Sequence, residues 1–344
     1  MHRTYLPIVP ATALRRHRAS EPFDHRFRAC ARLLQSLWRV ERGLPIGGFT
    51  RASGETKRLG SMISERAGET GANFLLPEIA RLARREVAYR EPRALVEERR
   101  LWCNLLSSMP LTFNVFGLLK LDTKLATRMV RTLLPSLADA TVEAVLFEHS
   151  PGRGDITLTA DYTAFDVMLT YSRPGGISGF VAVEVKYAES AGEAQKELNP
   201  RYAELAPAAG LHKAPDAQAL TRGPLQQFYR QHLLAQAMVK RGDYVEGTFM
   251  VLAPALNTPV QSTVVRYADQ LAEPAADKVA FVSVTLEQFV EHLRQCGHRA
   301  YANLLHRRYL DWSRVDETIE QVIADFGRLP TVGNDNTAAT REAA

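Results

Sequence analysis

The sequence of 344 residues predicts an α/β protein in which a mixed sheet follows a helical first third. Three observations support this class. Apolar residues recur at helical spacing through most of residues 21–140, and three consecutive segments rich in β-branched and aromatic residues begin at Val142. A helical segment then precedes two more short apolar segments. The predicted order after the helical part is strand, strand, strand, helix, strand, strand.

Four helices are expected in the first third, because apolar residues repeat there every three to four positions. They cover Phe23–Val40, Leu75–Arg90, Arg93–Ser107 and Asp122–Leu137. The segment Asn104–Gly117 mixes large apolar residues with Pro110, and we expect this proline to break a helix.

The strands are separated by turns that contain proline or glycine. We expect strands at Val142–His149, Tyr162–Tyr171, Gly179–Tyr187, Glu246–Ala253 and Val279–Val284. Helices are expected at Pro224–Arg241, with proline near the first turn, and at Thr285–Cys296, where Thr285 and Gln288 form a capping box.

The pattern divides the chain into five parts. Residues 1–20 are basic, contain Pro7 and Pro10, and are expected to be flexible, whereas 331–344 are small and polar and are expected to be disordered. Between them we expect a helical N-terminal region at 21–140, the core at 141–296 and C-terminal helices at 297–330.

Composition excludes several classes of protein. With 46% hydrophobic and 24% charged residues the chain is expected to be globular, and no apolar run is long enough for a membrane-spanning helix. Cys30, Cys103 and Cys296 are odd in number and form no C-x-x-C, which argues against a disulfide framework and against a zinc ribbon. We therefore expect a cytoplasmic location.

Charge is distributed unevenly along the chain. Residues 1–140 hold 24 Lys and Arg against 13 Asp and Glu, whereas the remainder holds 19 against 25. A basic half can contact a polyanion, although arginines that merely decorate solvated helices give the same count.

Three charged residues lie within predicted strands whose other residues are mostly apolar and are expected to be buried. They are Asp166, Glu184 and Lys186. A buried charge is costly unless it is paired or bound to a metal. Glu184 and Lys186 lie two residues apart and so share one face of their strand, while Val183, Val185 and their alternating neighbours take the other.

The predicted hairpin places the two acids opposite each other. If its turn is centred near Gly175, facing residues have numbers that sum to 350, which pairs Asp166 with Glu184. Their Cβ atoms would then lie about 4.5–5.5 Å apart. A slip of one residue would put them on opposite faces. Two carboxylates this close favour a shared Mg²⁺ or Mn²⁺, which prefers oxygen ligands.

The arrangement of Asp166, 17 intervening residues, Glu184, one residue and Lys186 on a hairpin that is followed by a helix and two strands resembles the PD-(D/E)XK nuclease superfamily. The hallmark Pro-Asp is replaced here by Phe165-Asp166. The resemblance implies a restriction-endonuclease-like αβββαβ core with a mixed sheet, here with a helical N-terminal elaboration. It also implies metal-dependent hydrolysis of nucleic acid, with Asp166 and Glu184 as metal ligands and Lys186 as the catalytic lysine. The expected substrate is DNA.

Several further residues are candidates. Glu148 ends the first predicted strand and could add a metal ligand, and Glu97 or Glu98 could supply an acid from the preceding helix. Contacts to nucleic acid are expected from Arg153, Gln227 and Arg230. Each has an ordinary alternative as a solvated or structural residue.

Two other functions remain open on the sequence. A binding or interaction module could keep the fold without catalysis, or Lys186 could form a buried ion pair with one acid in a purely structural role. The sequence has no GxGxxG, P-loop, G-x-S-x-G or HExxH motif, so nothing in it supports a nucleotide-cofactor enzyme, an NTPase, a serine hydrolase or a zincin.

Overall fold

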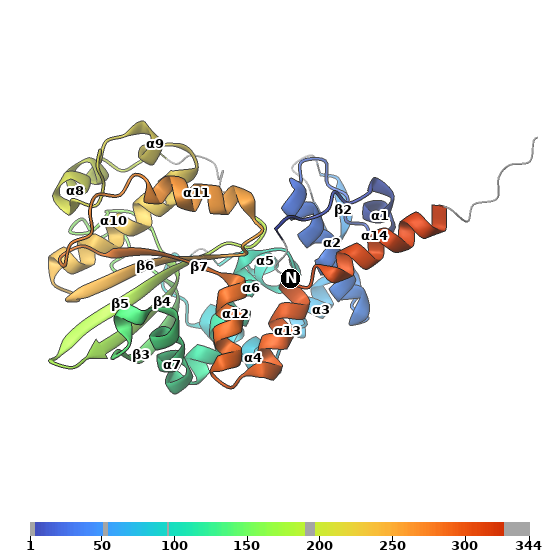
Figure 1. Cartoon of the computed structure of the whole chain (residues 1–344), viewed down its shortest axis with the longest axis horizontal. Coiled ribbons are helices and arrows are strands. Elements are labelled where there is room, and N and C mark those ends of the chain that lie inside the picture. Colours follow the sequence, from blue (N-terminus) through green and yellow to red (C-terminus); the bar gives the residue numbers. More distant parts are fainter. Residues whose placement is uncertain (1–3, 51–53, 95, 190–196, 327–344) are drawn as a thin grey trace, which may run out of the picture.

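A five-stranded mixed sheet forms the centre of the computed structural model, which describes residues 4–50, 54–94, 96–189 and 197–326 (Figure 1). The strand order is β3-β4-β5-β6-β7, with β3, β4 and β5 antiparallel and β5, β6 and β7 parallel. The bounds are β3 Thr141–His149, β4 Phe165–Arg173, β5 Ile177–Val185, β6 Glu246–Ala253 and β7 Ala280–Thr285. The five strands expected from the sequence, and their order, are confirmed.

Alternation of side chains gives the sheet two buried faces. On β5, Val181, Val183 and Val185 belong to one hydrophobic cluster, and Phe180 and Ala182 belong to the other. The second cluster lies under α8 (Arg201–Ala209), α10 (Gln226–Arg241) and α11 (Thr258–Ala268), whereas the first is covered by helices from both ends of the chain. Because α10 and α11 connect β5, β6 and β7, these strands can run parallel. Glu184 has the parity of Ala182 and so lies on the α10 face.

The N-terminal region is mainly helical, as expected, but it also contains a hairpin that the sequence did not indicate. Its elements are α1 Ala11–Arg16, α2 Arg26–Glu41, β1 Ile46–Thr50, β2 Thr56–Ile63, α3 Glu65–Glu69, α4 Pro77–Ala88, α5 Glu98–Cys103, α6 Ser108–Leu121, α7 Thr123–Leu133 and the 3₁₀ turn Pro135–Leu137. Strands β1 and β2 pair antiparallel. A short α9, Gln218–Thr221, and a 3₁₀ turn, Gly223–Leu225, precede α10.

The expectation of a flexible segment over 1–20 is wrong for the described residues 4–20. Leu6 and Val9 are buried, and α1 follows them directly. The carbonyl of His17 accepts a hydrogen bond from Ser36 Oγ of α2 at 2.7 Å. Leu6 and Val9 therefore pack on the core, although the segment is basic overall.

Helix α6 corrects the interpretation of Pro110. This proline is the third residue of the helix, a position where a backbone N–H has no partner within the helix, so its ring starts the helix instead of breaking it. Ser107 caps the helix by accepting from Met109 N at 3.2 Å. Helix α6 is buried on most of its surface, which removed the amphipathic signal.

The chain continues after the sheet into three helices. These are α12 Leu286–Gln295, with the expected capping box at Thr285, α13 Arg299–Tyr309 and α14 Ser313–Phe326. Helix α14 reaches back to the N-terminal helices, where Arg16 Nη1 contacts Asp325 Oδ2 at 2.9 Å (Figure 1). The expected tail at 331–344 lies outside the described residues. Within the described ranges, none of the helices combines the length and apolar character that crossing a membrane requires.

Arg308 joins α13 to the N-terminal region. It is completely buried and donates to Asn73 O at 2.6 Å and to Asn73 Oδ1 at 2.5 Å. Its guanidinium carbon lies 4.1 Å from the ring centroid of Trp38 and 4.8 Å from that of Tyr309. Neutral oxygens and aromatic faces therefore stabilise this cation, and in the described part of the chain no carboxylate pairs with it.

Replacing Arg308 is expected to destabilise the fold. Arg308→Ala removes the donor of two buried acceptors, Asn73 Oδ1 and Gln35 Oε1, and opens a cavity against Trp38, which should lower the free energy of unfolding by about 3–5 kcal/mol in urea titrations. The neighbouring Arg307→Ala removes only an exposed pair with Glu41 and should cost at most about 1 kcal/mol. Equal losses in the two variants would contradict this role of Arg308.

A second buried network holds α10 against β7. The hydroxyl of Tyr267 contacts His212 Nε2 at 3.1 Å and His232 Nδ1 at 3.0 Å, and His232 Nε2 lies 2.9 Å from the Val279 carbonyl. Burial lowers the pKa of His212 to about 3 and that of His232 to about 4.

The pH dependence of stability should report this network. Both folded-state pKa values lie below the ordinary value of 6.5, so the unfolded chain binds protons first as the pH falls. The stabilisation is fully present above pH 6.5. As the pH falls, the part due to His232 is lost between about pH 6.5 and 4 and the part due to His212 between about pH 6.5 and 3, each by up to about 1.4 kcal/mol per pH unit. In urea titrations, His212→Gln should flatten this slope. An unchanged slope would show that His212 does not contribute.

Candidate active site

Three carboxylates stand in a row across β3, β4 and β5. Phe147 pairs with Val167 and His149 with Phe165, so Glu148 lies across from Asp166. Val167 pairs with Val183, which places Asp166 across from Glu184. The register in which facing residues sum to 350 is thus confirmed. Asp166 Oδ2 also accepts a hydrogen bond from Val185 N at 2.7 Å, which ties its carboxylate to β5.

Lys186 lies directly beside Glu184. Its Nζ is 2.8 Å from Glu184 Oε1, and both side chains are almost completely buried. Lys186 Nζ also donates to Gln227 Oε1 at 2.7 Å. Glu184 and Lys186 therefore point to the same side of the strand, as their spacing predicts.

Two glutamines of α10 hold this pair from above the sheet. Gln227 Nε2 donates to Glu184 Oε1 at 2.7 Å, and Gln231 Nε2 donates to Glu184 Oε2 at 2.5 Å. Residues four apart on a helix share a face, so both amides reach the same carboxylate. Gln227 was expected to contact nucleic acid, but its amide is bonded within the site. Gln231 was missed, although its spacing from Gln227 is visible in the sequence.

The three neighbouring carboxylates of Glu148, Asp166 and Glu184 repel one another, and burial together with this repulsion raises the pKa of Asp166 and of Glu148. Burial, followed by repulsion from Glu184 and Glu148, raises the pKa of Asp166 well above its ordinary value, even though Lys186 opposes the shift. Burial and then repulsion from Glu184 raise the pKa of Glu148 to about 7. A group of carboxylates of this kind is stabilised by added positive charge.

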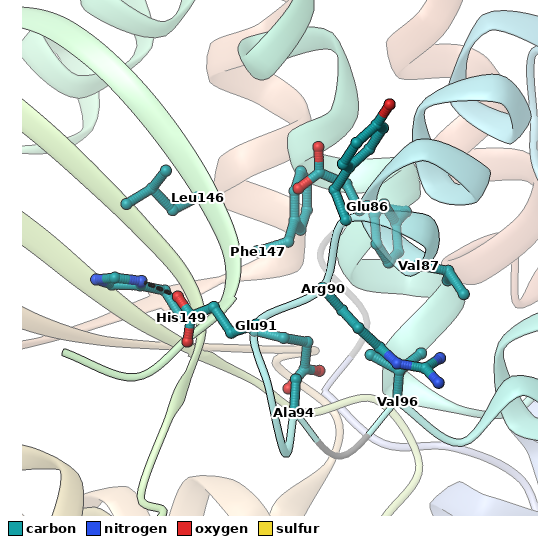
Figure 2. A pocket seen from close by; sticks show the side chains of 12 residues that line it. Glu86, Val87, Arg90, Glu91, Ala94, Val96, Leu146, Phe147 and His149 are labelled. Atoms are coloured by element: carbon teal, nitrogen blue, oxygen red, sulfur yellow. Dashed lines mark hydrogen bonds and ion pairs between the residues drawn. The ribbon is translucent and has the colours of Figure 1, made fainter. Parts of the chain in front are cut away.

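Glu148 is held in a strained backbone conformation. Its φ of 48° lies in the left-handed region, which a non-glycine residue adopts at a cost of roughly 1–3 kcal/mol. Arg153 Nη2 donates to the Glu148 carbonyl at 2.7 Å, and Arg153 Nε donates to Glu91 Oε2 at 2.9 Å. Glu91 Oε1 lies 2.5 Å from His149 Nδ1, the contact drawn in Figure 2. This cluster fixes the end of β3.

The same cluster borders a small cavity. Its volume is about 160 Å³, and Glu148 lines it together with Phe113, Phe147 and the segment that carries Glu91 (Figure 2). Burial opposes ionisation of Glu91, but hydrogen bonds from His149, Ser150 N and Arg153 outweigh burial, and the pKa of Glu91 lies below its ordinary value. The charged form of Glu91 is therefore the one that holds His149 and Arg153.

The row of Glu148, Asp166 and Glu184 offers the type of ligand atom, carboxylate oxygen, that a divalent cation such as Mg²⁺ prefers. Asp166, Glu184 and Glu148 offer carboxylate oxygens, and Gln231 Oε1 is buried beside them without a hydrogen-bond partner among the described residues. Over those residues, no group of three or more His, Cys, Asp and Glu side chains is arranged to hold a metal ion. Both Glu184 oxygens face Lys186 and the glutamines in this arrangement. Two carboxylates can nevertheless be enough for Mg²⁺, which keeps several waters.

Arg100 and Glu189 also belong to the surroundings of the site, and the sequence reading missed both. Glu189 follows Lys186 by three residues and accepts from Tyr187 N at 3.0 Å and from Ser108 N at 2.7 Å. Arg100 Nη2 of α5 lies 3.6 Å from Glu189 Oε1. Its positive charge also opposes the rise in the pKa of Glu148.

The acid expected from the preceding helix is not observed at the site. Glu97 and Glu98 have side chains that are more than half exposed, and they pair with Arg100 and Arg90 respectively. Helix α5 thus brings an arginine toward the carboxylates in place of an acid.

Two expected contacts to nucleic acid have internal partners instead. Arg153 is only 9% exposed and holds Glu91 and Glu148. Arg230 Nη2 contacts Asp161 Oδ2 at 2.9 Å and Thr163 Oγ1 at 2.6 Å. Both arginine side chains are mostly buried and donate to acceptors of the chain itself, so the structure does not favour contacts with phosphate.

Comparison with known families agrees with this geometry. The sequence matches the family described as the PD-(D/E)XK nuclease superfamily over residues 22–311. The chain belongs to this superfamily. No curated protein and no solved structure matches the chain.

Membership of the PD-(D/E)XK superfamily accounts for the architecture of the sheet. The mixed α/β arrangement is consistent with the restriction-endonuclease-like fold. Asp166 lies on β4, Glu184 lies on β5, and Lys186 directly follows β5.

The charge balance of the row gives opposite expectations for two substitutions in metal-free buffer. Asp166→Asn removes repulsion and should not lower the free energy of unfolding, whereas Lys186→Met leaves Glu184 buried without its cation and should lower this free energy by about 3–5 kcal/mol. Lys240→Met, which removes an exposed pair on α10, is the control and should change it by at most about 1 kcal/mol. Urea titrations measure all three. A clear loss in Asp166→Asn would contradict the repulsion.

Proposed function

We propose that this protein hydrolyses phosphodiester bonds of DNA with the help of Mg²⁺ or Mn²⁺. The observation that carries the proposal is the row of Glu148, Asp166 and Glu184 with Lys186 at its end. Asp166 and Glu184 are proposed as the metal ligands, Glu148 as a further ligand, and Lys186 as the catalytic lysine. Membership of a nuclease superfamily supports this assignment.

The bound cation would supply a water of lowered pKa and would offset negative charge on the phosphate. The chain's own residues prepare the site for this chemistry. Gln227 and Gln231 orient the Glu184 carboxylate, and Gln227 also positions Lys186 Nζ. The ammonium of Lys186 can then donate a hydrogen bond to a phosphate oxygen as negative charge develops there, or orient the attacking water.

Binding of nucleic acid is proposed from charge and not from any base contact, and DNA is the nucleic acid that we propose as substrate. The basic N-terminal half supplies positive charge for a polyanion. A location in the cytoplasm and the divisions of the chain at 21–140, 141–296 and 297–330 are likewise proposals. Cys30, Cys103 and Cys296 are free thiols, which supports a reducing compartment.

The Lys186–Glu184 contact at 2.8 Å also favours a second reading, in which the trio is only a structural ion pair in a protein that binds nucleic acid without cutting it. Titration calorimetry with Mg²⁺ separates the readings. A metal site should bind Mg²⁺ in the wild type and lose this binding in Asp166→Ala.

Cleavage assays test the nuclease proposal directly. Supercoiled, linear, nicked and single-stranded DNA are incubated with Mg²⁺ or Mn²⁺, and Glu184→Gln and Lys186→Met should each slow cleavage by about 100-fold or more. Glu143→Gln alters an exposed acid on β3 and should cut like the wild type. Absence of cleavage of every substrate, or undiminished cleavage by both site variants, would overturn the proposal.

A further inference from the structure

A groove opens between the N-terminal region and the candidate site. Its volume is about 460 Å³, and it lies between the β1–β2 hairpin, α2 and α5. We call it the α5 groove. The residues that matter here are Arg28, Phe49, Arg99, Arg100, Ser107 and Glu189.

The α5 groove borders the segment that directly follows Lys186. Arg28 Nη1 donates to the Ala188 carbonyl at 2.8 Å, and Glu189 binds the backbone N–H groups of Tyr187 and Ala188 at 3.0 and 3.2 Å. The groove wall and the catalytic lysine are therefore parts of one connected stretch of backbone. Burial opposes ionisation of Glu189, which lines the groove, but backbone hydrogen bonds and the positive charge of Lys186 lower its pKa, so the lysine lies close to the groove wall.

Two arginines of the groove are half exposed, and Arg100 is the more loosely held of them, because Arg99 Nη2 also donates to the Gly48 carbonyl of β1 at 2.7 Å. Arg99 and Arg100 have side chains 44% and 41% exposed, and their ion pairs with Glu65, Glu97 and Glu189 span 3.9, 3.8 and 3.6 Å. These separations exceed the length of a good charged hydrogen bond. In the described residues Arg100 makes no shorter polar contact, so its guanidinium can take a phosphate oxygen at little cost.

The size and lining of the α5 groove suit one strand of nucleic acid. Its volume falls within the range of about 300–1,000 Å³ that is typical of small-molecule sites, so it takes one or two nucleotides and not the width of a duplex. The ring of Phe49 lines the groove and is only partly buried. Arginines beside an aromatic ring are typical of sites for unpaired strands.

We propose that the α5 groove binds the backbone of one unpaired DNA strand beside the scissile phosphate, with Arg99 and Arg100 on phosphates and Phe49 against a base. The proposal deepens the proposed nuclease function and rests on it for the reaction. Binding itself can be measured without cleavage.

Fluorescence anisotropy in EDTA measures this binding. The probe is a labelled single-stranded DNA oligonucleotide about a dozen nucleotides long, tested alone and annealed to its complement. Arg99→Gln and Arg100→Gln should each weaken single-strand binding at least about threefold and reduce the slope of log K against log salt by about 0.7 per lost phosphate contact. Phe49→Ala should also weaken it, and Phe49→Tyr should restore it.

Arg128→Gln is the matched control, because Arg128 is exposed on α7 and α7 packs near the start of β3, at the opposite end from Glu148. It should bind like the wild type. Wild-type affinity and salt slope in both Arg99→Gln and Arg100→Gln would overturn the proposal, as would stronger binding to the duplex or no binding of the wild type. If the groove variants bind single-stranded DNA normally but the wild type cleaves DNA, the groove proposal is wrong and the nuclease proposal stands. If binding depends on the two arginines but the wild type cleaves no substrate, the groove proposal is supported and the nuclease proposal is wrong.

Discussion

Repulsion among carboxylates is the constraint on which the other features of the site depend. Glu148, Asp166 and Glu184 come from three neighbouring strands, and Lys186 is the cation that touches Glu184. Such a row is stable only if the protein supplies donors and positive charge around it. The glutamines of α10, the amide of Val185 and the charges of Lys186 and Arg100 are those contributions. The arrangement suits a function that brings further positive charge to the row.

A buried cation outside the row, Arg308, fixes the N-terminal region against the C-terminal helices. Arg308 lies between Trp38 of α2 and Asn73, and Gln35 Nε2 of the same helix donates to the carbonyl of Arg308 and to the hydroxyl of Tyr187. Tyr187 immediately follows Lys186. The helices that were expected only as an elaboration are therefore bonded to the segment that follows β5, which allows α5 to approach the carboxylates.

The sheet could be predicted because its strands are rich in β-branched and aromatic residues and are separated by turns with proline or glycine. The centre of the turn between β4 and β5 was identifiable near Gly175, and it determined the register of Asp166 and Glu184.

Elements without such patterns were missed. Helix α6 is apolar on nearly all sides, and the β1–β2 hairpin contains Gly47 and Gly48, which weaken a strand signal. Arg100 and Arg230 could not be assigned from sequence, because the role of an arginine depends on which acceptors lie nearby. Gln231 had a signal, its spacing from Gln227, but amides are common on helices.

The three acids differ in what holds them, and Glu148, with its left-handed backbone conformation, differs from Asp166 and Glu184. Asp166 is anchored by the β5 backbone and Glu184 by α10, so both are as rigid as the sheet. Glu148 depends on Arg153, and Arg153 depends on Glu91 in the segment between α4 and α5. The position of the third acid therefore depends on that segment as well as on the sheet. The three acids are thus supported by separate parts of the chain.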